Sequence, residues 1–219
     1  MSIKWLTQRE LILKRSLNGV ALWDYDGAIS TSEPIQIEAY RLLLDQHNVE
    51  AEQDLRIKYL VNKTSEQSLA QLKTDYQLTP TVDELLSEKN DIVDELISLT
   101  GEPTWFLAEL ISHLNNQGTE IAILSNGQSS RIKKAWNRWN LAETPTIYTK
   151  DLMGEGFNKK DMEKELIKQD KAKIVFEGNI ANLSQAKKME VFAVGIKSRS
   201  NGLTDQNANL VLDLSFRTF

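Results

Sequence analysis

GVALWDYDGAISTSEP, residues 19–34, is the stretch of sequence that decides the fold. Its apolar run, residues 20–23, predicts a short buried β-strand, and the carboxylates Asp24 and Asp26 follow that strand directly before Gly27. Acids after a strand often only form a turn or cap a helix. A calcium-binding loop does not fit, because its sixth position takes glycine and here holds Ile29. The remaining alternative is a site that handles phosphate together with a metal ion.

The composition narrows the class of protein. The chain has 219 residues, which suits one moderate domain or a core domain with a smaller insertion. Its net charge of −5 and the lack of a basic block give no electrostatic support for nucleic-acid binding. Cysteine is absent, which excludes disulfides, thiolate catalysis and cysteine-based zinc sites. We find no secretory signal and no apolar run of about 18 residues, and we therefore expect a cytoplasmic protein that binds no membrane.

Beyond residues 19–34 the pattern divides the chain into two parts. Residues 34–101 read as helices throughout, with Thr64 or Ser65 and Thr81 as expected helix caps. After this block, apolar strands alternate with helices, which implies crossover connections and a parallel sheet covered on both faces. We therefore predict an α/β fold, with a doubly wound, Rossmann-like core domain in residues 1–33 and 102–219. Residues 34–101 would form an inserted α-helical cap domain.

Polar side chains follow three of the predicted strands. Besides Asp24 and Asp26, Ser125 follows the strand at 121–124, and Glu177 follows the strand at 174–176. Ligands of open α/β sheets bind at the carboxyl ends of the strands. Each of these residues alone is most simply a turn residue. Together they predict a single cleft facing the cap.

The order LWDYDG, helical insert, AILSNG, VFEGN resembles the haloacid dehalogenase (HAD) superfamily, and most nearly its β-phosphoglucomutase-like branch with a helical cap. The likeness runs from about residue 20 to residue 214, and its first motif is Asp-x-Asp-Gly-Thr after an apolar strand. The resemblance implies a magnesium-dependent phosphatase. Its substrate would be a small phosphorylated metabolite, and its intermediate an aspartyl-phosphate.

The resemblance also implies roles for individual residues. Asp24 would be the nucleophile, and Asp26 would protonate the leaving oxygen and then activate water. Gly27 would turn the chain so that both acids face one point. Ser125 would bind a phosphoryl oxygen, helped by the backbone N–H groups of Asn126 and Gly127. The implied ligands of Mg²⁺ are Asp24, Asp26 and Glu177.

The chain departs from the family pattern at three places. Ala28 replaces the threonine of the first motif. Strict alignment puts Phe157 at the position of the family lysine, so that Lys159 or Lys160 would have to supply the charge from a shifted loop. Gly178 stands where the family has an aspartate that binds the metal, which predicts weak Mg²⁺ binding.

The cap offers two candidate substrate-binding residues, Asn62 and Lys63, in a loop that often contacts the substrate in the family. Two hypotheses remain open on the sequence. The first is a magnesium-dependent phosphatase, supported by Asp24, Asp26 and Ser125. The second is a catalytically weak or inactive relative with a ligand- or partner-binding role, supported by Gly178. The sequence determines neither the substrate nor the oligomeric state.

Overall fold

The centre of the molecule is a single parallel sheet. The computed structural model describes residues 3–51, 55–60, 63–141, 144–169, 171–199 and 201–214. Six parallel strands pair in the order β3-β2-β1-β4-β5-β6, so β1 lies between β2 and β4. The strands are β1 (Val20–Asp24), β2 (Glu120–Leu124), β3 (Thr146–Tyr148), β4 (Ala172–Glu177), β5 (Phe192–Lys197) and β6 (Leu210–Asp213). The predicted α/β fold with a parallel sheet is confirmed.

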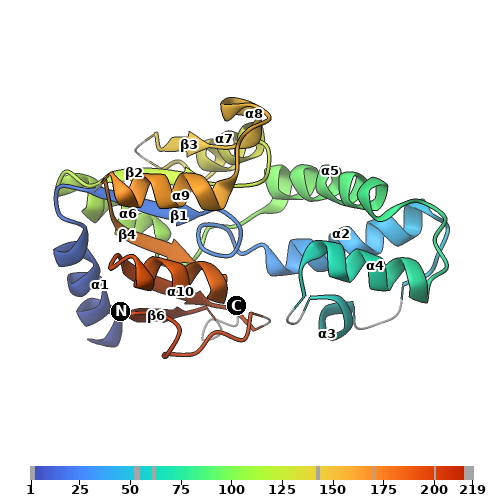
Figure 1. Ribbon diagram of the computed structural model, residues 1–219, viewed down its shortest axis with the longest axis horizontal. Helices are drawn as coiled ribbons and strands as arrows, with labels where there is room; N and C mark the ends of the chain where they lie inside the picture. Colours follow the sequence, from blue (N-terminus) through green and yellow to red (C-terminus); the bar gives the residue numbers. More distant parts are fainter. Residues whose placement is uncertain are drawn as a thin grey trace.

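Helices cover the sheet and also form a separate group beside it (Figure 1). The helices that accompany the sheet are α1 (Ile3–Ser16), α6 (Leu107–Asn116), α7 (Ser129–Arg138), α8 (Lys150–Met153), α9 (Lys159–Lys168) and α10 (Ile180–Lys188). The helices of the group beside the sheet are α2 (Glu33–Gln46), α3 (Leu55–Tyr59), α4 (Ser65–Asp75) and α5 (Val82–Thr100). We call this second group the cap.

The cap helices begin where the sequence provides side-chain caps. Thr64 accepts a hydrogen bond from the backbone of Gln67, whose side chain accepts one from the backbone of Thr64. Thr81 and Glu84 form the same reciprocal pair at the start of α5. Every element described between residues 33 and 100 is a helix. This agrees with a helical insertion, although the exact domain boundaries stay a prediction.

The alternation of side chains along β1 supplies a core on each face of the sheet. Trp23 belongs to a large buried cluster that continues through Phe106 into the cap at Tyr40. Its neighbour Leu22 points to the other face, into a smaller cluster with Leu183 of α10. Because both faces are buried, β1 is held rigidly, and so is the end of β1 that carries Asp24.

The described helices do not include a candidate membrane span, since none of them combines sufficient length with sufficient apolar character.

Candidate functional site

The end of β1 places two carboxylates at one edge of the sheet. Asp24 is the last residue of β1, and Asp26 follows within the turn. Gly27 has a φ of +85°, which side chains rarely tolerate, and its N–H donates to the carbonyl of Ser30 at 3.0 Å. The predicted turn at Gly27 is therefore present.

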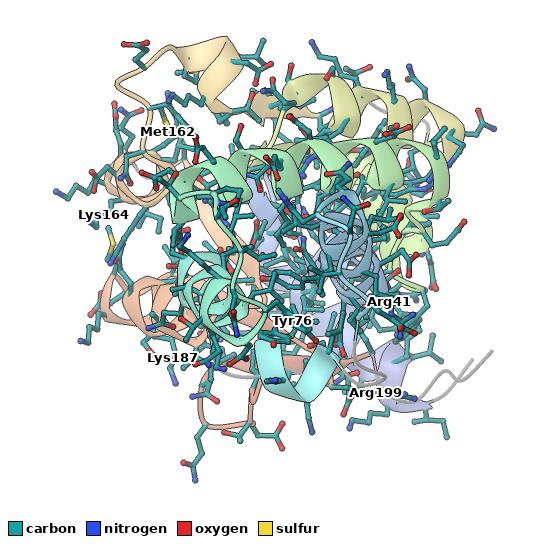
Figure 2. All side chains as sticks on the ribbon, turned by 90° about the vertical axis from the view of Figure 1, so that its right-hand side faces the viewer. Arg41, Tyr76, Met162, Lys164, Lys187 and Arg199 are labelled. Atoms are coloured by element: carbon teal, nitrogen blue, oxygen red, sulfur yellow. The ribbon has the colours of Figure 1, made fainter. Side chains whose placement is uncertain are left out.

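A cavity of about 600 Å³ opens beside these two acids, between the sheet edge and the cap. Asp24 and Asp26 line it from the sheet side, and Gln36 and Ile37 line it from α2. Figure 2 views the molecule from the cap end and labels Arg199, another residue of the cavity wall. The volume suits a small molecule.

Lys159, the first residue of α9, joins two of the predicted site acids. Its Nζ lies 2.7 Å from Asp24 Oδ1 and 3.0 Å from Glu177 Oε1. Burial lowers the pKa of Lys159, but the charges of Asp24 and Glu177 outweigh burial and raise the pKa above its ordinary value. The ammonium group therefore stays charged. Of the two lysines proposed from sequence, Lys159 contacts the acids, whereas Lys160 is exposed.

The pKa of the Asp24 carboxyl group is subject to opposing effects. Burial raises its pKa most strongly, and the negative charge of Glu177 acts in the same direction. The ammonium of Lys159 acts against both. Two carboxylates thus share one cation, so the trio of Asp24, Glu177 and Lys159 carries one excess negative charge when all three are ionised.

Glu177 is buried next to the cavity and accepts hydrogen bonds from neighbouring parts of the chain. Its Oε1 accepts hydrogen bonds from Lys159 and, at 2.9 Å, from Asn182 Nδ2. Its Oε2 accepts one from the backbone N–H of Asn179 at 3.1 Å. The side chain is 1% exposed. Glu177 therefore contacts the site through Lys159, while its neighbour Gly178 lines the cavity.

Ser125 follows β2 as predicted and is fully buried. Its Oγ accepts hydrogen bonds from the Gly127 N–H at 3.0 Å and from Arg131 Nη2 at 3.2 Å. The hydroxyl hydrogen of Ser125 is then left to donate. In this arrangement the Gly127 N–H serves Ser125, and Asn126 is exposed.

Arg131 is a site residue that we did not predict from the sequence. This side chain of α7 donates to Asp26 Oδ2 at 2.7 Å and to Asp94 Oδ1 of α5, also at 2.7 Å. It connects Asp26 with Ser125, just as Lys159 connects Asp24 with Glu177. The three acids and the one hydroxyl predicted at the strand ends therefore form two pairs, and one cation joins the members of each pair.

The two candidate substrate-binding residues of the cap loop lie differently. Asn62 is outside the described residues. Lys63 is exposed, and its Nζ donates to the backbone carbonyl of Lys58. Its contact with the ring of Tyr59, at 5.9 Å from Nζ to the ring centroid, keeps it on the cap surface. A role for either residue in substrate binding stays a prediction.

Comparison with known proteins places the chain in a family. A model of the haloacid dehalogenase-like hydrolases matches residues 21–196. The chain belongs to this family. A comparison with curated protein sequences gave no match.

Solved structures of the family share the fold at low sequence identity. CbbY from Rhodobacter sphaeroides, in complex with phosphate, is 14% identical with a TM-score of 0.67, over 90% of this chain and 93% of CbbY. A predicted phosphoglycolate phosphatase from Haemophilus somnus 129pt is 13% identical with a TM-score of 0.68, over 88% and 92% of the two chains. The magnesium-bound YfnB of Bacillus subtilis is 17% identical with a TM-score of 0.62, over 82% and 89%.

The family resemblance implies Mg²⁺, but this arrangement leaves few oxygen donors free for a divalent metal ion. Among the described residues, no group of three or more Asp, Glu, His or Cys side chains is placed to hold a metal. Mg²⁺ requires nearly octahedral oxygen ligation. Glu177 uses both of its oxygens for N–H donors, and Gly178 offers no carboxylate. Metal ligation by Asp24, Asp26 and Glu177 stays a prediction.

Proposed function

We propose that the chain is a phosphatase that hydrolyses a small phosphorylated metabolite through an aspartyl-phosphate on Asp24. The observation that carries this proposal is the placement of Asp24, a carboxylate in the cavity wall whose Oδ1 is held by the buried ammonium of Lys159. A fixed nucleophile beside a fixed positive charge favours attack on an anionic ester. The phosphate bound to CbbY supports this class of ligand.

The reaction would proceed in two displacements. In the first, an Asp24 oxygen forms a bond to phosphorus, the bond from phosphorus to the ester oxygen breaks, and Asp26 gives that oxygen a proton. In the second, Asp26 takes a proton from water, which attacks phosphorus and releases Asp24 and inorganic phosphate. The Lys159 ammonium compensates negative charge on the phosphoryl group, and the Ser125 hydroxyl donates to one of its oxygens.

Mg²⁺ is the cofactor that we propose for this site, with weak affinity. YfnB binds magnesium, which supports the choice of ion. The glycine at position 178 removes one expected carboxylate, so less negative charge compensates the ion. The two displacements above use only the side chains of the chain itself.

A ligand-binding protein without turnover is the second candidate. Two observations favour it: Gly178 lacks the carboxylate expected at the metal site, and Asp26 is paired with Arg131. The first removes an expected metal ligand, and the second engages one oxygen of Asp26 in a contact with the protein itself.

The experiment that separates the two candidates is hydrolysis of generic phosphate esters with Asp24→Asn as the test variant and Asp161→Asn as the control. Asp161 is an exposed acid at the start of α9, 71% exposed, and pairs with Lys164. We expect slow turnover by the wild type, unchanged turnover by Asp161→Asn, and background rates for Asp24→Asn. Rapid quenching followed by mass spectrometry should detect a phosphorylated Asp24 peptide. Turnover by Asp24→Asn would exclude the aspartyl-phosphate route, and an inactive wild type would favour the binding protein.

A further inference from the structure

Arg131 lies buried between the sheet and the cap, with 5% of its surface exposed. Its Nη2 donates to Asp26 Oδ2 at 2.7 Å and to Ser125 Oγ at 3.2 Å. Its Nη1 donates to Asp94 Oδ1 at 2.7 Å. Asp94 belongs to α5, so one guanidinium connects two site residues of the sheet edge with a carboxylate of the cap.

The surroundings of Arg131 are shaped for a guanidinium group. The buried ring of Tyr25 lies 5.4 Å from Arg131 Cζ. Gly127 leaves the space that the group fills, because a Cβ atom at this position would overlap the guanidinium. The planar guanidinium lies near an aromatic ring and donates to two carboxylates at once. A lysine ammonium, which is a compact point charge, cannot reproduce this geometry. The glycine of the loop after β2 is therefore explained by Arg131.

Arg131 is not needed to attach the cap to α7. Arg138 donates to the carbonyls of Ser98 and Gly101 at the end of α5. Trp139 Nε1 also donates to the Gly101 carbonyl, at 2.9 Å. These contacts already hold α5 against α7. What Arg131 adds is a connection from the cap to Asp26.

The position of the Asp26 carboxylate depends on this connection. Oδ2 is held by Arg131, whereas Oδ1 is buried and has no hydrogen-bond partner in the described part of the chain. Burying a carboxylate oxygen without a hydrogen-bond donor costs free energy. The contact of Oδ2 with Arg131 offsets this cost and keeps the Asp26 carboxylate in this position. We propose that Arg131 is a positioning residue that fixes Asp26 for the reaction and makes its placement depend on the cap through Asp94.

This inference rests on the proposed function, in which Asp26 transfers the proton. The guanidinium is shared between Asp26 and Asp94, and its nitrogens keep a fixed geometry. Loss of one carboxylate therefore lets the group turn towards the other. A displacement of about 1 Å in a reacting group can reduce a rate by about a hundredfold. Asp94 is not part of the cavity wall, so its replacement should act through Arg131 alone.

The kinetic test compares Asp94→Asn with Asp91→Asn, which removes an exposed acid from the same helix. We expect Asp94→Asn to lower kcat roughly tenfold with KM for the ester within about twofold, and Asp91→Asn to match the wild type. Arg131→Gln should lower kcat about a hundredfold, and Arg131→Lys should recover part of that loss. Thermal unfolding of each variant identifies any that do not fold. Wild-type kcat in a folded Asp94→Asn, or a rise in KM that accounts for the whole loss, would overturn the inference.

A second measurement does not require turnover. The ¹³Cγ resonance of Asp26, assigned with Asp26→Asn, should shift in Asp94→Asn and stay in place in Asp91→Asn at one fixed pH. If no ester is hydrolysed by the wild type, the proposed function fails, and this resonance still decides whether Asp94 reaches Asp26 through Arg131. An unmoved resonance in Asp94→Asn overturns the inference whatever the activity.

Discussion

Trp23 of β1 stacks on Phe176 of β4, with ring centroids 3.6 Å apart and ring planes 2° from parallel. The two residues are direct partners in the register of the parallel strands. The next residue of each strand is a site carboxylate, Asp24 or Glu177. The parallel pairing of these two residues therefore brings the two carboxylates side by side, where Lys159 contacts both.

Shortening Phe176 should reduce both stability and activity. Phe176→Ala leaves a cavity beside Trp23, and we expect the free energy of unfolding to fall by about 3–5 kcal/mol. Urea unfolding measures this loss. The control is Leu152→Ala, which shortens a side chain that is 49% exposed and should change stability by less than about 0.5 kcal/mol. A loss below about 1 kcal/mol for Phe176→Ala would show that the stack does not anchor β1 to β4.

The sheet, and the positions of Asp24 and Glu177 at the ends of its strands, could be predicted from the sequence for a physical reason. Strands buried on both faces, such as β1 and β4, are continuous apolar runs, and the chemistry of a parallel sheet gathers at the ends of those runs. Asp24 and Glu177 could therefore be found by locating the last apolar residue before them. Thr81 was predictable as a helix cap for a similarly local reason.

The two cations of the site were harder to predict, because their positions depend on contacts between distant elements. Alignment with the family put Phe157 at the lysine position, whereas the lysine that contacts Asp24 and Glu177 comes from the first turn of α9. Arg131 lies on the buried side of α7 with Ile132 and Ala135. A charged residue on the apolar side of a helix was the one signal in the sequence, and it does not reveal the partner carboxylates.

Replacing Lys159 tests which lysine serves the site. Lys159→Met leaves Asp24 and Glu177 as neighbouring carboxylates without their shared cation. We expect a loss of about 3–5 kcal/mol in the free energy of unfolding, together with background turnover. The matched control is Lys160→Met, which changes the exposed neighbour and should alter stability by less than about 0.5 kcal/mol. Equal effects of the two substitutions in urea unfolding and ester hydrolysis would contradict this assignment.

Lys89 of α5 should make stability depend on pH. Its side chain is 1% exposed, its Nζ donates to Gln36 Oε1, and the Tyr40 ring centroid lies 5.0 Å away. Burial lowers the pKa of Lys89 to about 8, against the opposing charge of Asp26. The unfolded chain, with a lysine pKa near 10.4, then binds more protons than the folded protein between about pH 8 and pH 10.

Stability should rise with pH across this interval, because the unfolded chain binds more protons there. A charged Lys89 destabilises the folded protein below about pH 8, and the penalty disappears as pH rises towards the unfolded pKa. Lys89→Met should therefore be more stable than the wild type near pH 7, by up to about 3 kcal/mol, and the difference should shrink towards pH 10. Urea unfolding at several pH values, with the exposed Lys160→Met as control, measures it. A difference that is constant with pH would show that Lys89 is not buried in its charged form.

Gly178→Asp should strengthen Mg²⁺ binding. A Cβ atom at Gly178 would lie 3.6 Å from Asn201 Nδ2 and 3.8 Å from the Ile196 carbonyl oxygen, which are ordinary contacts, and the backbone is not in the left-handed region. Position 178 lines the cavity beside Asp24, so a carboxylate there adds an oxygen ligand next to the predicted metal site. We expect roughly tenfold tighter Mg²⁺ binding in calorimetric titration and faster ester hydrolysis at limiting Mg²⁺.

The control for this substitution is Gly156→Asp, which adds the same charge at an exposed position with open space around it. Because Gly156 is not among the residues that line the cavity, Mg²⁺ affinity should remain that of the wild type. If the wild type already binds Mg²⁺ tightly and Gly178→Asp changes nothing, then Glu177 exchanges its N–H donors for the ion and supplies the missing ligand itself. If Gly178→Asp binds Mg²⁺ but still hydrolyses no ester, the defect lies in the proton transfer at Asp26 rather than in the metal site. In that case the protein is better explained as a ligand-binding protein in which Asp26 is the partner of Arg131 and transfers no proton.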